Sequence, residues 1–233
     1  MDIKNENIQV NDKQLFLLET HLEGILEANK IHNLTRITSP EEAIVLHIED
    51  SLSGLKEINE APEGRYADLG TGGGFPGIPL AIMTGRKTLL VDSVKKKVNV
   101  LAELIESMGL SDQIGTYAGR IEDLAREQRF AFSVVTARAL SSLPSLMELA
   151  SPLLKRDGHL ICYKAHITDE ELETAQLLQK KFGMELYSKR SFMLSDGVTE
   201  RCIIVFTKSG KPKVTLPRRS GMAQKNPFGT PHA

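Results

Sequence analysis

The stretch Asp68-Leu-Gly-Thr-Gly-Gly-Gly-Phe-Pro-Gly-Ile-Pro-Leu-Ala81 decides the fold of this chain. A short strand-like run, 66–69, leads into its glycines, and a helical pattern, 78–83, follows them. A glycine-rich turn between a strand and a helix lies at the ligand crevice of a doubly wound α/β sheet. Glycines let the backbone come close to a ligand there, and the start of the helix offers free N–H groups. The stretch therefore predicts a binding site.

Strand and helix patterns alternate outward from this turn, which is the signature of a parallel sheet covered on both faces. The alternation places strands at 66–69, 88–92, 114–118, 132–136 and 159–163, and helices at 78–83, 94–108, 121–127, 142–154 and 168–182. Two final strand-like runs, 184–192 and 200–208, are joined without a helix. We therefore expect a Rossmann-like α/β fold, with a mostly parallel seven-stranded sheet that ends in an antiparallel hairpin.

The two ends of the chain differ from this pattern. Helical sequence precedes the first strand, at 13–30 and from 40 to about 56, and a linker follows at 60–64. The segment 208–233 has six basic residues and no acidic ones, so 1–207 carries −1 − 6 = −7. A local basic patch suits contact with a polyanion, although a solvated, disordered end is the alternative.

These shifts divide the chain into three parts. We expect an N-terminal helical extension over 1–62 that packs on an α/β domain over 63–208, and a basic, flexible tail over 209–233.

Composition excludes several classes of protein. Hydrophobic residues are 41% and charged residues 25% of the 233 residues, which is ordinary for a globular chain and unlike a disordered or disulfide-dense one. Cys162 and Cys202 lie in strand-like runs and are expected to be reduced core thiols. We expect no metal site, because no Cys/His cluster is present, and no membrane span, because no apolar run approaches ~20 residues. The N-terminus lacks a signal peptide, so we expect a cytoplasmic location.

The glycine loop permits two interpretations. Gly72, Gly74 and Gly77 match GxGxxG, and Asp92 follows Gly72 by 20 residues, which is the spacing of a dinucleotide site. Alternatively, Asp68 before the glycines suits a cationic amino acid group, as in S-adenosylmethionine, and would repel a pyrophosphate. Asp92 can accept hydrogen bonds from ribose hydroxyls in either case. Helices before the first strand and a terminal hairpin favour the methyltransferase interpretation.

Further motifs resemble one known family, the small-subunit ribosomal RNA guanine-N7 methyltransferases, also called glucose-inhibited division protein B. The segments that carry the resemblance are 68–81, Asn33-Leu-Thr-Arg-Ile-Thr38, His47-Ile-Glu-Asp-Ser51, Leu90-Val-Asp-Ser93, Gly119-Arg-Ile-Glu122, Thr136-Ala-Arg-Ala139, and Pro217-Arg-Arg with Asn226-Pro227. The tail departs from the family's Pro-Arg-Lys-Pro-Gly pattern at Arg219-Ser-Gly-Met222.

The resemblance implies that the enzyme transfers a methyl group from S-adenosylmethionine to N7 of a specific guanine in small-subunit (16S) ribosomal RNA, free or in a ribosomal particle. We expect the protein to be a monomer. It implies that Ile121 and Glu122 meet the adenine. The full set of expected cofactor-binding residues is Gly70, Gly72, Gly74, Phe75, Asp92, Ile121, Glu122 and Arg138.

The expected chemistry needs no base, because guanine N7 has a free lone pair, and no catalytic residue is assigned. Arg138, at the end of a strand, is expected to contact the cofactor or the target nucleotide; an ion pair to a carboxylate such as Asp68 or Glu122 is the alternative. Lys164 is expected at the same crevice. Two other functions stay open at this point, an NAD(P)-dependent oxidoreductase and a non-catalytic RNA-binding assembly factor.

Overall fold

A computed structural model describes residues 8–229 except 33 and 36. Its single sheet has seven strands. They are β1 (Tyr66–Leu69), β2 (Thr88–Asp92), β3 (Ile114–Ala118), β4 (Phe132–Arg138), β5 (Leu154–Lys164), β6 (Met184–Met193) and β7 (Glu200–Lys208). Their order across the sheet is β3-β2-β1-β4-β5-β7-β6.

The sheet reverses direction only at its terminal hairpin. β1 to β5 pair in parallel, whereas β7 is antiparallel to both β5 and β6. The order changes sides at β1, so the β1–α5 turn and the segment after β4 meet at the switch point where ligands bind in such sheets. The predicted fold class is thereby confirmed.

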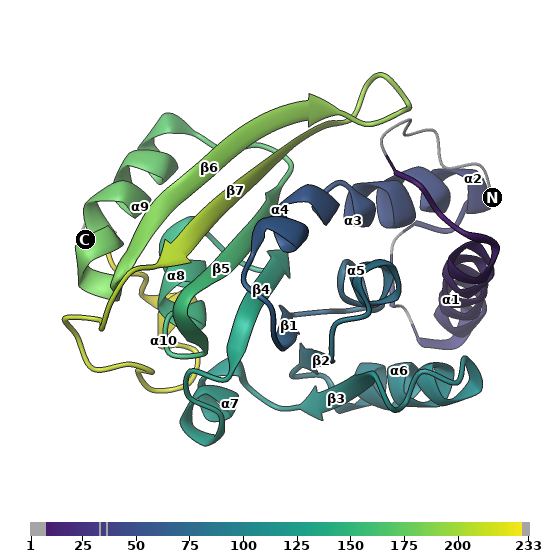
Figure 1. Cartoon of the computed structure of the whole chain (residues 1–233), viewed down its shortest axis with the longest axis horizontal. Coiled ribbons are helices and arrows are strands. Elements are labelled where there is room, and N and C mark those ends of the chain that lie inside the picture. The colour runs from purple at the N-terminus through teal and green to yellow at the C-terminus, as the bar shows by residue number, and fades with distance from the viewer. Residues whose placement is uncertain (1–7, 33, 36, 230–233) are drawn as a thin grey trace.

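Helices cover both faces of the sheet (Figure 1). The described helices are α1 (Asp12–His32), α2 (Pro40–Ala43), the π-helix η1 (Ile44–Glu49), α3 (Asp50–Leu52), α4 (Leu55–Glu60), α5 (Gly77–Thr84), α6 (Lys95–Ser107), α7 (Ile121–Glu127), α8 (Leu143–Ala150), α9 (Asp169–Phe182) and α10 (Met222–Lys225). One hydrophobic cluster joins α1, η1, α5 and α6. Another joins α7, α8 and α9 to the opposite face.

The segment predicted as one helix to residue 56 is continuous only from Pro40 to Leu52, where α2, η1 and α3 follow one another without a gap. A turn at Gly54 separates α3 from α4, and a Cβ on Gly54 would lie 1.9 Å from the Tyr163 hydroxyl oxygen. That hydroxyl donates a hydrogen bond to the Ser51 carbonyl at 2.8 Å. The helical periodicity is therefore interrupted by a contact with β5, which local sequence does not encode.

Two other boundaries also differ from the prediction. The helix expected to reach 154 ends at Ala150, and β5 already begins at Leu154. Leu154 pairs with Phe132 of β4, which draws the end of the apolar run into the sheet. The linker expected from residue 60 begins only after α4 ends at Glu60.

The C-terminal segment packs on the body, unlike the flexible tail that its composition predicts. Leu216 is 3% exposed and Ala223 is 1% exposed, and Ala223 packs under α8. The Ser145 hydroxyl donates to the Ala223 carbonyl at 2.6 Å. Apolar side chains at 216 and 223, two of the few in this basic segment, fix it in place.

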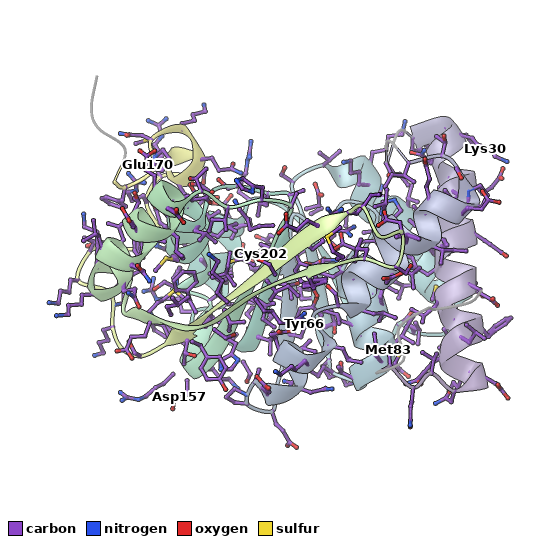
Figure 2. All side chains as sticks on the ribbon, turned by 90° about the horizontal axis from the view of Figure 1, so that it is seen from above. Lys30, Tyr66, Met83, Asp157, Glu170 and Cys202 are labelled. Atoms are coloured by element: carbon purple, nitrogen blue, oxygen red, sulfur yellow. The ribbon has the colours of Figure 1, made fainter. Side chains whose placement is uncertain are left out.

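The carboxyl ends of the parallel strands form one edge of the molecule. Figure 2 shows Lys30, near the end of α1, and Glu170, near the start of α9, toward this edge, with Asp157 at the opposite edge. Within the described part of the chain, every helix is too short or too polar to cross a membrane. Cys162 and Cys202 are buried free thiols.

Candidate active site

The glycine loop is held in place by its own backbone and by β2. Gly70 N–H donates to the Val91 carbonyl at 2.8 Å, and Gly74 N–H donates to the Thr71 carbonyl at 2.9 Å. Gly70 and Gly72 have φ of 69° and 57°, the left-handed region that favours glycine. A Cβ on Gly72 would meet only the Gly70 carbonyl oxygen, at 3.9 Å. The backbone at Gly72 is thus open to a ligand.

Asp68 secures the loop from beneath and does not reach the crevice. Its side chain is fully buried; it accepts hydrogen bonds from Thr136 Oγ1 at 2.6 Å and from Gly77 N–H at 3.1 Å. Burial raises the pKa of Asp68 to about 6. The interpretation that Asp68 itself meets an ammonium group therefore has no direct contact available in this arrangement.

Four of the expected cofactor residues line one cavity of about 170 Å³: Gly70, Asp92, Ile121 and Glu122. Asp92 Oδ2 accepts from Gly72 N–H at 3.1 Å, and Asp92 Oδ1 accepts from Val94 N–H at 2.8 Å. These bonds fix the carboxylate at the mouth of the loop. We refer to this space as the loop cavity.

Gly74 and Phe75 lie behind the loop cavity, against the N-terminal helices. Phe75 is buried between two histidine rings, His21 and His47, each with its centroid 4.4 Å from the phenyl centroid. A Cβ on Gly74 would lie 3.0 Å from His21 Nε2. These two predicted residues thus support the loop and do not line the loop cavity.

His21 is a supporting residue that the sequence prediction missed. Its Nε2 lies 2.9 Å from the Gly73 carbonyl oxygen, and since a carbonyl only accepts, Nε2 carries the proton. Burial lowers the pKa of His21 to about 4. Burial, with the nearby charge of Arg138, lowers the pKa of His47 to about 3. The one available signal was a histidine within the apolar stripe of α1.

Arg138 lies in a second cavity of about 550 Å³, which we call the basic cavity. Its Nη1 donates to Asp50 Oδ2 at 2.9 Å and to the Leu46 carbonyl at 3.0 Å. Asp50 also accepts from Arg201 Nε at 3.2 Å. The alternative prediction of an ion pair was right in kind but wrong in its suggested partners, Asp68 and Glu122.

Lys164 lies in the basic cavity as well, with Nζ 2.8 Å from Glu171 Oε1. The cavity's lining therefore carries three cationic groups, on Arg138, Lys164 and Arg201, beside the Asp50 carboxylate. The prediction that Lys164 faces the crevice agrees with this position.

The segment 139–141, directly after β4, separates the two cavities. Leu140 lines the loop cavity, whereas Ala139 and Ser141 line the basic cavity. The two cavities therefore share this short segment as a common wall. The arrangement is suited to transfer of a small group between two bound molecules.

A thiol nucleophile is not available at this site. Cys162 is fully buried, and burial raises the pKa of its thiol far above the usual value. Buried cysteines with undepressed pKa values are chemically inert. Within 8–229, apart from 33 and 36, no group of three or more His, Cys, Asp or Glu side chains could hold a metal ion.

Part of the N-terminal motif cannot be placed: Asn33 and Arg36 lie outside the described residues. Of the rest of that motif, Thr35 Oγ1 lies 2.9 Å from His47 Nε2. The two N-terminal segments named in the sequence resemblance are thus in contact.

Comparison with known proteins matches this architecture to one family. A family model described as rRNA small subunit methyltransferase G matches residues 14–196. The ribosomal RNA small subunit methyltransferase G of Lachnoclostridium phytofermentans is 36% identical over 229 residues, covering 97% of this chain and 94% of that protein. The protein of the same name from Bacillus licheniformis is 33% identical, covering 97% of this chain and 95% of its own length.

Solved structures share the fold at low sequence identity. An O-methyltransferase from Bacillus cereus, crystallised with S-adenosylhomocysteine, has a TM-score of 0.58 and 17% identity, covering 88% of this chain and 95% of that chain. A methyltransferase-like protein from Bacillus halodurans has a TM-score of 0.51 and 16% identity, covering 68% of this chain and 99% of that chain. At these identities the likeness concerns the fold alone.

Proposed function

The chain belongs to the rRNA small subunit methyltransferase G family of S-adenosylmethionine-dependent enzymes, and we propose that it methylates N7 of one guanine in small-subunit ribosomal RNA. The observation that carries the proposal is the pair of cavities separated by 139–141. S-adenosylmethionine supplies a methyl group on a cationic sulfur. The N7 lone pair forms the new N–C bond while the S–C bond breaks, leaving S-adenosylhomocysteine and a cationic base.

The loop cavity suits the adenosine half of the cofactor. In the proposal, Asp92 accepts hydrogen bonds from the ribose hydroxyls, and Ile121 and Glu122 face the adenine. Gly70, which lines the cavity, and the open backbone at Gly72 meet the rest of the molecule. Gly74 and Phe75 support the loop from behind, whereas Arg138 belongs to the basic cavity, and none of the three lines the loop cavity.

A pyrophosphate-containing dinucleotide suits this site poorly. The Gly77 N–H, at the start of α5, already donates to the Asp68 carboxylate, and Ile78 N–H donates to the Gly74 carbonyl at 2.7 Å. The donors that a dinucleotide fold offers to phosphate are thus engaged within the protein. Asp92 and Glu122 would also repel phosphate from the loop cavity. These contacts disfavour the oxidoreductase interpretation.

The basic cavity suits the target nucleotide. Its volume, about 550 Å³, lies within the range of about 300–1,000 Å³ typical of ligand pockets. Arg138, Lys164 and Arg201 would bind the phosphate or O6 of the guanosine, and the rings of His47 and Tyr163 border the space. Because the major groove of A-form RNA is too deep and narrow to enter, the guanine must lie in a loop or leave its stack.

The chain's own residues then act by positioning and by excluding water. The Asp50 carboxylate, which bonds Arg138 and Arg201, holds both guanidinium groups in place before RNA arrives. We also propose that the protein is a monomer, that it is located in the cytoplasm, and that its substrate is either naked RNA or a ribosomal particle. The division of the chain into 1–62, 63–208 and 209–233 is part of the same proposal.

A transfer assay with labelled S-adenosylmethionine tests the proposal. Purified protein is expected to label small-subunit ribosomal RNA, either deproteinised or in partly assembled particles, taken from cells that lack this protein. RNA from wild-type cells, already methylated, is the matched control and should take up far less label. Tight cofactor binding with no transfer to any of these substrates would contradict the proposal and favour the assembly factor.

Calorimetry separates the oxidoreductase alternative. The protein is expected to bind S-adenosylhomocysteine and to show no heat of binding with NADH or NADPH. Binding of a nicotinamide cofactor without binding of S-adenosylhomocysteine would reverse the assignment of the loop cavity.

A further inference from the structure

The loop cavity has a wall that comes from the far end of the chain. Gln224, in α10, lines the cavity together with Asp92 and Glu122, although 102 positions separate it from Glu122. Its Nε2 lies 3.3 Å from the carbonyl oxygen of Leu140, which lines the same cavity. The C-terminal segment 216–226, which we call the strap, therefore reaches the proposed cofactor site.

The strap is anchored by one charged pair and two buried side chains. Arg218 Nε and Nη2 donate to the two carboxylate oxygens of Glu148, both at 2.6 Å. The Glu148 side chain is 3% exposed and the Arg218 side chain 20% exposed, so the carboxylate is shielded from solvent and the pair is partly buried. Leu216 and Ala223 are buried on either side of this pair. A two-pronged, partly buried pair of this kind fixes orientation as well as position.

Glu122 connects the strap to the adenine side of the loop cavity. It is 6% exposed, and its Oε1 accepts a hydrogen bond from Gly221 N–H at 2.5 Å. Gly221 has φ of 84°, so the backbone there turns in the left-handed region to present this N–H. The carboxylate expected to face the adenine is thus positioned by the strap.

The loop cavity is small for the adenosine half of S-adenosylmethionine. Its volume of about 170 Å³ is below the ~300 Å³ at which pockets for molecules of this size begin. The strap crosses its rim on a short helix whose Gln224 and Lys225 side chains are exposed. Outward displacement of this segment would widen the cavity without disturbing the sheet.

We propose that the strap closes over the adenosine half of S-adenosylmethionine, with Gln224 as a cofactor-contacting residue and Arg218 as a positioning residue. The inference rests on the proposed function, because it takes the loop cavity as the cofactor site. Closure places the Gln224 amide against the bound adenosine, and the Arg218–Glu148 pair fixes the closed position of the strap. A disordered tail would not hold Gln224 in this position.

The test measures S-adenosylhomocysteine affinity without RNA, by calorimetry, on the full-length chain. Q224A is expected to raise the dissociation constant about tenfold, while Q176A, the same change at an exposed site on α9, leaves it within twofold. R218A is expected to raise it at least tenfold, and R218K to recover only part of the loss, since lysine lacks the two-pronged geometry.

Thermal unfolding of the same variants separates positioning from general destabilisation. Because Gln224 is exposed, Q224A is expected to keep the wild-type melting temperature, so its weaker binding is not a folding defect even where R218A unfolds early. If the Q224A variant and the R218K variant each bind S-adenosylhomocysteine with wild-type affinity, the proposed role of the strap is overturned while the proposed function stays intact. Wild-type protein that fails to bind S-adenosylhomocysteine overturns both.

Discussion

At the scale of single residues, the site depends on buried polar groups that brace the glycine loop. Asp68 bonds Thr136 and Gly77 from beneath, and His21 bonds the Gly73 carbonyl from the side of α1. Both side chains are fully buried, so their protonation states are set by desolvation. The loop's shape is therefore linked to pH through two groups with opposite effects.

Asp68 makes the fold less stable as pH rises. Burial raises the pKa of Asp68 to about 6, against about 3.9 for an unfolded aspartate. Between these values the folded state keeps a proton that the unfolded state has lost, so this contribution to the free energy of unfolding falls with rising pH. Relative to D68N, wild-type protein should lose roughly 3 kcal/mol between about pH 4 and pH 7. Urea unfolding of both proteins across this range measures the difference, and a constant difference contradicts the account.

His21 acts in the opposite direction. Burial lowers the pKa of His21 to about 4, so between about pH 6.5 and pH 4 the unfolded state takes up a proton that the folded state refuses. Relative to H21Q, whose amide can still donate to Gly73, wild-type protein should lose roughly 3 kcal/mol as pH falls through this window. The same unfolding series measures it. If wild-type protein instead lost stability relative to H21Q as pH rises through this window, His21 would be charged in the fold.

At the scale of elements, the strands, their directions and the first helix were predictable, whereas the division of the second predicted helix was not. The period of the sequence changes clearly at the glycine loop, and strands 66–69, 114–118 and 200–208 have the predicted bounds. The break at Gly54 depends on Tyr163, more than a hundred residues away, so no local pattern reports it. The packing of the strap was also missed, because its composition is dominated by charged residues, whereas two apolar residues, Leu216 and Ala223, decide its packing.

The break between α3 and α4 depends on the absence of a side chain at Gly54. G54A would place a Cβ 1.9 Å from the Tyr163 hydroxyl oxygen and 2.7 Å from Cζ. We expect it to lower the free energy of unfolding by about 3 kcal/mol, the upper end for overpacking. G115A is the matched control, because its Cβ would meet nothing closer than Leu89 Cδ1 at 3.7 Å. Denaturant unfolding that finds the two variants equally stable would mean that Tyr163 moves aside freely.

At the scale of the whole molecule, both ends of the chain complete the site that the sheet begins. The N-terminal helices supply Asp50, which pairs with Arg138 of β4 and Arg201 of β7. The C-terminal strap supplies Gln224 to the loop cavity. Four of the expected cofactor residues share this cavity: Asp92, predicted from its spacing, and Gly70, Ile121 and Glu122, which the family resemblance implied. Neither source predicted that Arg138 lies in a different cavity.

This separation gives Arg138 a distinct kinetic signature. R138A is expected to lower kcat/KM for RNA on the order of 100-fold, about 2.7 kcal/mol of transition-state stabilisation, with little change in S-adenosylhomocysteine affinity. R156A removes an exposed arginine next to Asp157, at the opposite edge of the molecule, and should leave both values unchanged. Loss of cofactor affinity in R138A, equal to its loss of RNA turnover, would return Arg138 to the cofactor site.

Nucleoside mass spectrometry of the RNA product tests the central claim most directly. Small-subunit ribosomal RNA from cells lacking this protein is incubated with the purified chain and S-adenosylmethionine, then digested and mapped. The account predicts one 7-methylguanosine, at a single position that is unmodified before incubation and methylated in wild-type cells. A methyl group on any other atom or base, or no new methyl group at all, would contradict it.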